Sequence, residues 1–260
     1  MLRRERPAVP GRASGTLLEM APAVSDGFHP PLEEYLETIH ALNEEGVQVI
    51  QARLVERLKL SAQSVSEMVQ RLASEGYLDR KRQELTLTPK GRVRAESVVR
   101  KHRLAERFLV DVVGLPWHTA HVEAGRWEHV ISEQVERRLV ELLDYPVRCP
   151  HGNLIPGLDE LGVPAEAKQR GLAAEREQAV AMTEVASERP GRVIVRRISE
   201  QVQSDAPLML KLKRSGIQPG REVLLALNDD GVQVTSEDKA GSITAELPRL
   251  VAVHVFVTRL

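Results

Sequence analysis

The chain has 260 residues, of which 42% are hydrophobic and 3% aromatic, and its formal net charge is −1 at pH 7. This length allows two compact domains or three small ones, with cores built from aliphatic side chains. The single cysteine, Cys149, excludes a disulfide within the chain and fits a reducing compartment. No apolar run is long enough to span a bilayer. The near-neutral charge excludes a uniformly basic protein, so a nucleic-acid site has to be sought region by region.

Residues 1–27 consist largely of Pro, Gly, Ser and Ala interspersed with arginines. They contain no continuous apolar segment of the secretory type. We therefore expect a cytoplasmic protein whose N-terminal arm is disordered. A weak nonspecific contact between the arginines of this arm and DNA is the alternative.

Three helices and two short strands are expected next along the chain. Apolar residues recur at helical spacing in 31–43, in 49–58 and after Ser61, whose hydroxyl is suited to begin a helix that runs to about residue 75. Period-two runs at 77–80 and 85–88 then predict two strands joined by a charged tip. Helix, helix, short turn, helix and ribbon is the order of a winged helix-turn-helix, whose recognition helix fits the major groove.

Local charge supports a DNA-binding function for this region. Residues 53–100 contain eleven Lys or Arg and six Asp or Glu, although the whole chain is slightly acidic. The alternative is that these charges belong to ordinary solvated helix faces. Polar side chains of the third helix and the ribbon are the candidates for contacts with bases and phosphates. These candidates are Ser61, Gln63, Ser64, Ser66, Glu67, Gln70, Arg71, Arg80, Lys81 and Arg82.

Two further helices are predicted at 89–113 and 120–143, and both carry side chains that bind metals. His102 and Glu106 are four residues apart, so they lie on one face of the first helix. Imidazole together with carboxylate suits Mn, Fe, Zn, Co or Ni, whereas the alternative is a set of ordinary surface pairs. One face of the second predicted helix carries His121, Gly125, Glu128 and His129.

The first predicted helix adds Glu34 and Glu37, three residues apart. Because this helix belongs to the expected DNA-binding region, a metal shared between these carboxylates and the later helices would couple metal occupancy to DNA affinity. Cys149 and His151 lie in a loop after those helices, and we interpret them as structural residues.

The rest of the chain changes from irregular to β-rich. Residues 164–188 are charged and rich in Ala, which predicts a helical linker. From residue 191 onward, five short β-rich runs separated by turns predict a small barrel or sandwich.

Three segments resemble the diphtheria toxin repressor family of iron- and manganese-dependent regulators. They are RKHRLAERFL (100–109), RWEHVISEQVERRLV (126–140) and PHGNLIPGLDELGV (150–163). The resemblance extends from about Leu32 to the end of the chain and implies a mainly α fold with a small β domain. The expected parts are a disordered arm at 1–27, a winged helix-turn-helix DNA-binding domain at 28–96, a metal-binding and dimerisation domain at 97–163, a linker at 164–190 and an SH3-like domain at 191–260.

The resemblance also implies a homodimer on double-stranded palindromic operator DNA, with two metal sites per subunit. The first site would comprise His102, Glu106, His121, Glu200 and Gln203. The second, switch-like site would comprise Glu34, Glu37, Glu128, His129 and the backbone of Gly125.

The chain departs from the iron-type members of the family at two positions of the second site. They have Met where this chain has Glu34, and Cys where it has Gly125; the manganese-type members have carboxylates at both. Because a hard carboxylate favours Mn(II) over softer metals, we expect a repressor that senses Mn(II), with Fe(II) as second choice, and controls metal homeostasis genes without enzyme activity. The alternatives are a metal-independent DNA-binding regulator and a metallohydrolase that uses the His/Glu cluster.

Overall fold

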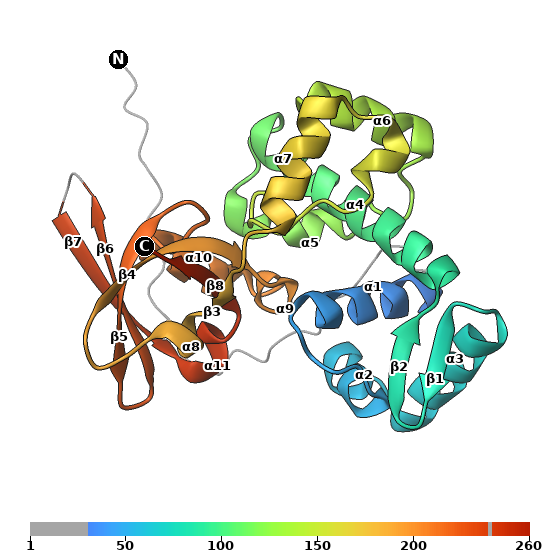
Figure 1. The fold of residues 1–260 in the computed structure, drawn as a ribbon, viewed down its shortest axis with the longest axis horizontal. Helices are drawn as coiled ribbons and strands as arrows, with labels where there is room; N and C mark the ends of the chain where they lie inside the picture. Colours follow the sequence, from blue (N-terminus) through green and yellow to red (C-terminus); the bar gives the residue numbers. More distant parts are fainter. Residues whose placement is uncertain (1–30, 239–240) are drawn as a thin grey trace, which may run out of the picture.

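A computed structural model describes residues 31–238 and 241–260, so the predicted disordered arm at 1–27 lies outside the described residues. Helices form most of the N-terminal two thirds, and an antiparallel sheet forms the C-terminal part (Figure 1). Within the described ranges, no helix combines the length and the apolar character needed to cross a membrane. The expected mainly α fold with a small β domain is confirmed.

The N-terminal head has the predicted order of a winged helix-turn-helix. Its core is one cluster of aliphatic side chains that includes Leu36, Ile39, Val65 and Leu72, contributed by three helices and the ribbon. The elements are α1 (Pro31–Glu44), α2 (Gln51–Leu58), α3 (Ala62–Ser74), β1 (Leu78–Lys81) and β2 (Glu84–Leu87).

Local chemistry sets the boundaries of the recognition helix α3 and of the helix after the ribbon. The Ser61 side chain accepts a hydrogen bond from the backbone N–H of Ser64 at 3.1 Å, which confirms the predicted N-cap. Helix α4 (Pro89–Asp111) begins against the ribbon at Gly91, where a Cβ atom would lie 2.0 Å from the Tyr77 carbonyl oxygen. Only glycine permits this close approach.

The central helical part is built around α4, which contacts α1 on the head side and α5 and α6 on the other. Buried residues such as Leu104 and Leu109 on α4 pack with apolar residues of the later helices and loops. The other elements are η1 (Trp117–Thr119), α5 (Ala120–Ala124), α6 (Glu133–Leu142), η2 (Leu158–Leu161) and α7 (Ala165–Glu175).

The predicted single helix at 120–143 is wrong. Helix α5 ends at Ala124 with Gly125 as its C-cap, and turns follow as far as residue 130. Ser132 then begins α6 by accepting a hydrogen bond from the Val135 N–H at 3.3 Å. The physical reason is that glycine costs about 1 kcal/mol relative to alanine inside a helix, while serine gains a partner at an N-cap.

The C-terminal part is a six-stranded antiparallel sheet of order β3-β8-β4-β5-β6-β7 with an apolar core of its own. The predicted SH3-like class is confirmed, although the sheet is an open series of strands in place of a closed barrel. Residues 180–181, expected in the linker, form a strand of this sheet, and α10 was not expected. The elements are β3 (Val180–Ala181), α8 (Met182–Val185), β4 (Gly191–Ile198), α9 (Glu200–Gln203), α10 (Ala206–Arg214), β5 (Glu222–Asn228), β6 (Gly231–Asp238), β7 (Gly241–Pro248), α11 (Arg249–Ala252) and β8 (Val255–Arg259).

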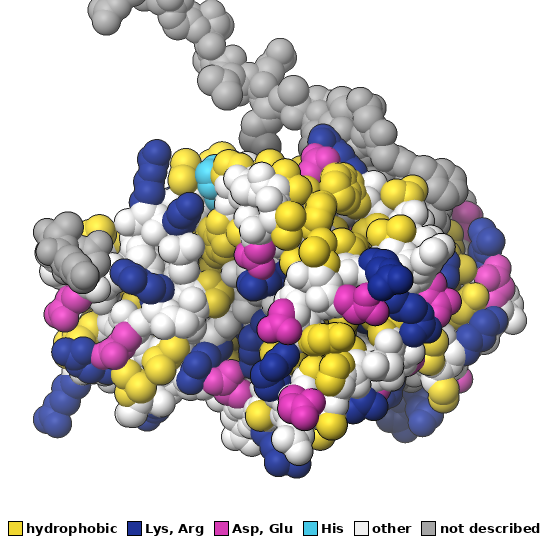
Figure 2. All heavy atoms as spheres, turned by 90° about the horizontal axis from the view of Figure 1, so that it is seen from above, with side chains coloured by type: hydrophobic (Ala, Val, Ile, Leu, Met, Phe, Trp, Pro, Cys, Tyr) yellow, Lys and Arg dark blue, Asp and Glu magenta, His cyan; other side chains and the backbone are white. Residues whose placement is uncertain are grey.

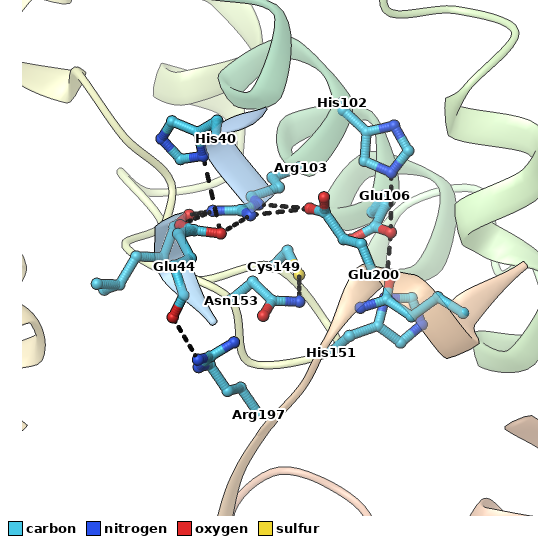
Figure 3. Close-up of polar contacts among 12 residues, drawn as sticks. His40, Glu44, His102, Arg103, Glu106, Cys149, His151, Asn153, Arg197 and Glu200 are labelled. Carbon is cyan, nitrogen blue, oxygen red and sulfur yellow. Dashed lines mark hydrogen bonds and ion pairs between the residues drawn. The ribbon is translucent and has the colours of Figure 1, made fainter. Parts of the chain in front are cut away.

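One buried side chain, Arg103 of α4, connects all three parts. Its guanidinium forms two hydrogen bonds with the Glu44 carboxylate at the end of α1, at 2.8 and 2.5 Å, and one with Glu200 of α9 at 2.9 Å. It also donates to the backbone carbonyl of Leu154. Figure 3 shows Arg103 between the two carboxylates. Because the Arg103 side chain is fully buried, these charge-assisted bonds hold the head and the C-terminal part against α4.

Candidate metal centre and DNA-binding surface

Three imidazole rings converge on one carboxylate oxygen in the C-terminal half of α4. Glu106 Oε1 lies 3.1 Å from His102 Nε2, 3.1 Å from His121 Nδ1 and 3.2 Å from His151 Nδ1. Figure 3 shows His102 and His151 on opposite sides of this carboxylate. Helix spacing brings His102 and Glu106 together as predicted, and the start of α5 adds His121.

The donor set around Glu106 fits a metal ion. His151 donates Nε2–H to the Trp117 carbonyl oxygen at 3.0 Å, which leaves the lone pair of Nδ1 facing the Glu106 carboxylate. Although His151 Nδ1 lies 3.2 Å from Glu106 Oε1, it forms no hydrogen bond with any described residue. Glu106 Oε2 is likewise without a hydrogen-bond partner among the described residues. Buried acceptors that face one another require a proton or a cation between them. A histidine that donates its other N–H to a backbone carbonyl is also the usual arrangement of a metal ligand.

The loop before His151 contributes a thiol to the same place. Ligand atoms of Glu106, Cys149 and His151 lie within 4.8 Å of one another, and all three residues are buried. Cys149 and His151, which the sequence alone indicates as structural residues, are therefore added to the candidate ligands. The sequence signal was the two-residue spacing of Cys and His in a loop, and that signal is weak without knowledge of Glu106.

Electrostatics agree with a site that attracts cations. Burial alone would raise the pKa of Glu106, but the neighbouring histidines, led by His151, hold it well below its ordinary value. Burial would likewise lower the pKa of His102, but Glu128 and Glu106 raise it well above the usual range. In the absence of metal, a proton on His102 compensates the charge of the carboxylates beside it.

A second group of candidate ligands crosses from the head to α4. Ligand atoms of Glu37, His102 and Glu128 lie within 4.8 Å of one another. His102 Nδ1 hydrogen-bonds Glu128 Oε2, so this imidazole borders both groups. Burial, followed by repulsion from Glu128, raises the pKa of Glu37 well above its ordinary value. A divalent cation would stabilise this close pair of carboxylates, Glu37 and Glu128, by compensating their charge.

The head makes one more contact with this region, through Glu33. His129 Nδ1 lies 2.5 Å from Glu33 Oε2, and His129 Nε2 lies 3.1 Å from Glu128 Oε1. Glu33 is 5% exposed, and its other oxygen pairs with Arg94 of α4. Glu34, predicted as a ligand, is not in any group of candidate ligands among the described residues. Consecutive helical residues point about 100° apart, so Glu33 and Glu37, four residues apart, share the face that meets the metal centre.

Two predicted ligands of the first site are placed differently from the expectation. Glu200 forms an ion pair with Arg103 at 2.8 Å and is absent from the ligand groups found among the described residues. Gln203 donates Nε2–H to the Ile198 carbonyl oxygen, and its buried Oε1 has no partner in the described part of the chain. The prediction could not include the ion pair, because the approach of α9 to Arg103 is a tertiary contact.

Gly125 lies at the C-cap of α5, one turn before Glu128. A Cβ atom built there would meet only the carbonyl oxygens of His121 and Val122, both at 3.7 Å, which is ordinary van der Waals contact. Its φ of −59° is also accessible to any residue. The site therefore has room for a side chain at this position.

The predicted DNA-binding residues form one exposed surface on α3 and the ribbon. All are exposed except Ser66, which is half-buried, while Val65, Val69 and Leu72 on the opposite face of α3 are buried. Gln63 hydrogen-bonds Glu67 at 3.0 Å on the outer face. The other residues of this surface are Ser61, Ser64, Gln70, Arg71, Arg80, Lys81 and Arg82.

Family models match most of the helical part of the chain. Residues 28–84 match the iron-dependent repressor N-terminal DNA-binding domain, and residues 88–157 match the iron-dependent repressor metal-binding and dimerisation domain. Among curated proteins, the iron-dependent repressor IdeR of Mycobacterium tuberculosis is 48% identical over 203 residues, which is 76% of this chain and 85% of that protein. The diphtheria toxin repressor of Corynebacterium diphtheriae is 38% identical over 226 residues, covering 85% and 96%.

Solved structures agree with the fold. A manganese-dependent transcriptional repressor in complex with manganese has a TM-score of 0.72 at 29% identity, covering 88% of this chain and 100% of that one. IdeR of T. acidophilum has a TM-score of 0.66 at 28% identity, covering 88% and 97%. The similar proteins are thus named for iron in some cases and for manganese in others. The chain belongs to the iron-dependent repressor family that includes diphtheria toxin repressor, whose members are metal-dependent transcriptional repressors and not enzymes.

Proposed function

We propose that this repressor senses Mn(II), with Fe(II) as the second choice, and that it controls metal homeostasis genes from the cytoplasm. The observation that carries the proposal is the group Glu37, His102 and Glu128, because it joins the DNA-binding head to α4 through oxygen and nitrogen ligands alone. Hard carboxylates favour Mn(II) relative to later, softer metals. A thiol occurs only at the neighbouring group, through Cys149.

Metal occupancy would act by fixing the head on the central helical part. Glu37 belongs to α1, whereas His102 and Glu128 belong to α4 and to the segment between α5 and α6. A cation held by all three would replace the repulsion between Glu37 and Glu128 by attraction to a shared charge. An equilibrium between head positions shifts toward the one that binds the metal best, and DNA affinity shifts with it.

Dimerisation would place two recognition helices on one operator. Apolar side chains are exposed just after α4, between α5 and α6, and at the end of α6; they include Val113 (55%), Val130 (72%) and Leu142 (61%). Figure 2 shows apolar side chains alternating with both signs of charge, without a broad field of one sign. An apolar surface in a family that dimerises through this domain is suited to a two-fold interface. A two-fold dimer requires a palindromic site with half-sites about one helical turn, roughly 34 Å, apart.

The proposed DNA contacts are those of the exposed face of α3 and of the ribbon tip. Gln63, Glu67 and Gln70 would meet base edges, whereas Arg71, Lys81 and Arg82 would meet phosphates. The phosphate contacts make binding dependent on salt, so affinities have to be compared at one fixed ionic strength.

The test uses the full-length dimer and a DNA fragment that the Mn(II)-loaded protein selects from a randomised library. Fluorescence anisotropy then gives the affinity for this fragment with chelator, Mn(II), Zn(II) and, without oxygen, Fe(II). We expect at least a tenfold gain with Mn(II), at lower free concentration than the other metals require. Equal affinity with chelator and with every metal would contradict the proposal.

A matched pair of glutamine variants tests which residues produce the gain in DNA affinity with Mn(II). Glu128→Gln removes a charge from the candidate ligands, whereas Glu133→Gln removes an exposed charge at the start of α6 that pairs with Arg137 four residues further along the same helix. We expect Glu128→Gln to lose the response to Mn(II) and Glu133→Gln to keep it. The same response in both variants would place the sensing site elsewhere.

A further inference from the structure

Helix α1 contacts His129 through Glu33, a residue outside the groups of candidate ligands. His129 faces two carboxylates, with Nδ1 2.5 Å from Glu33 Oε2 and Nε2 3.1 Å from Glu128 Oε1. The His129 side chain is 1% exposed and that of Glu33 is 7% exposed. The buried hydrogen bond between His129 and Glu33 of the head therefore sets the orientation of the His129 ring.

The two nitrogens of His129 have different roles in this geometry. Neither Glu33 nor His129 is in the groups of candidate ligands found among the described residues, but His129 Nε2 lies 3.1 Å from Glu128, which is in one of them. A hydrogen bond from Nδ1–H to Glu33 leaves Nε2 as the nitrogen that can bind a metal beside Glu128. A carboxylate that accepts the remote N–H of a ligating histidine fixes its tautomer and makes the ligand more basic.

We propose that Glu33 is a positioning residue of the sensing site, which holds His129 from the DNA-binding head so that Nε2 is directed toward Glu128. The proposal rests on the proposed function, because it concerns the same metal site. It adds a second link between head and centre: Glu37 reaches the ligands directly, and Glu33 reaches them through His129. Arg94 on α4 compensates the Glu33 charge from the opposite side of the carboxylate.

Three variants of the full-length protein test this role. Glu33→Ala removes the acceptor, Glu33→Gln keeps an acceptor oxygen without the charge, and Glu133→Gln removes a carboxylate that does not contact a histidine. The Mn(II) dissociation constant is measured without DNA by electron paramagnetic resonance titration. Electron spin echo modulation of the bound Mn(II) reports imidazole nitrogen coordination, which a merely structural role of Glu33 would leave unchanged.

The expected result is graded. Glu33→Ala weakens Mn(II) binding by about 10- to 100-fold and reduces the imidazole modulation, as for other residues that orient a ligating histidine. Glu33→Gln loses less than Glu33→Ala, and Glu133→Gln matches the wild type. If Glu33→Ala keeps the Mn(II) affinity and the imidazole modulation of the wild type, the proposed role of Glu33 is overturned. The proposed function then still stands, provided that the wild-type protein responds to Mn(II). Absence of Mn(II) binding by the wild-type protein would overturn both.

Discussion

Replacing Glu37 by glutamine should change the stability of the metal-free and the metal-bound protein in opposite directions. Glu37 is a carboxylate whose pKa is raised, first by burial and then by Glu128. Ionisation of Glu37 therefore costs stability, and this cost grows as the pH rises from the unfolded-state pKa to the higher folded-state value. Glutamine removes the charge at nearly constant shape, so the metal-free variant should unfold at a higher temperature than the wild type at pH 7.5.

The response to Mn(II) should shrink in the same variant. A ligand at 100 times its dissociation constant stabilises the folded state by about 2.7 kcal/mol. At about 2–4 °C per kcal/mol for a chain of this size, the wild type should gain about 5–11 °C. If losing the Glu37 charge weakens binding about 100-fold, the same Mn(II) concentration stabilises the variant by only about 0.4 kcal/mol, or about 1–2 °C.

Differential scanning fluorimetry with chelator and with Mn(II) measures both effects, and a repeat near pH 4 supplies the control. There Glu37 is protonated in the folded chain and mostly protonated in the unfolded chain, so the metal-free difference between wild type and variant should shrink. A lower unfolding temperature of the metal-free variant at pH 7.5, or an undiminished gain with Mn(II), would refute the assignment of Glu37.

Three other predictions follow from the centre and its surroundings. Burial would lower the pKa of His129, but Glu128 and Glu33 raise it to about 9, so Mn(II) must displace a proton to bind. The affinity of the protein for Mn(II) should therefore rise by up to about tenfold per pH unit toward pH 9. Calorimetric titration in buffers of different ionisation enthalpy measures the proton release, and its absence would contradict this prediction. Gly125→Cys, which meets no close atom, should fold as well as the wild type and shift the metal preference from Mn(II) toward Zn(II); an unchanged preference in the anisotropy assay would place residue 125 outside the site. Burial would raise the pKa of Glu44, but Arg103 lowers it to about 2. The ionised Glu44 therefore contributes a few kcal/mol of stability, which is complete above the unfolded-state pKa near 4.5 and is lost as the pH falls toward 2. In denaturant unfolding, the wild type should lose more stability between pH 5 and pH 3 than Glu44→Gln does, and equal losses would contradict the ion pair.

The sequence predicted the helical head, the ribbon and the pairing of His102 with Glu106, because these depend on local periodicity. The spacing of four residues in a helix places two side chains on one face whatever surrounds them. Gly125 shows the limit of the same reasoning. The helix expected from 120 to 143 ends there, so the residues at 121 and 129 approach the centre through a turn and not along one helical face.

The other differences concern contacts between distant segments. The spacing of residues on α1 predicts Glu34 as a ligand, and that stays a prediction; it could not reveal the contact of Glu33 with His129, because packing against α4 decides which face of α1 meets the centre. Glu200 was expected at the metal and is held by Arg103, whose charge it compensates. His151 reaches Glu106 from a loop 45 residues further along the chain, and no local pattern encodes such a distance.

The distance between the two recognition helices of the dimer tests the central claim most directly. Spin labels attached at Ser74→Cys lie at the exposed end of α3, whereas native Cys149 is buried and shielded from the label. Pulsed dipolar spectroscopy then compares the label distances with chelator and with Mn(II). We predict a broad distance distribution without metal and a narrower one with Mn(II), centred on the separation that two half-sites about 34 Å apart require. Superimposable distributions under the two conditions would contradict the coupling of the metal centre to the DNA-binding head.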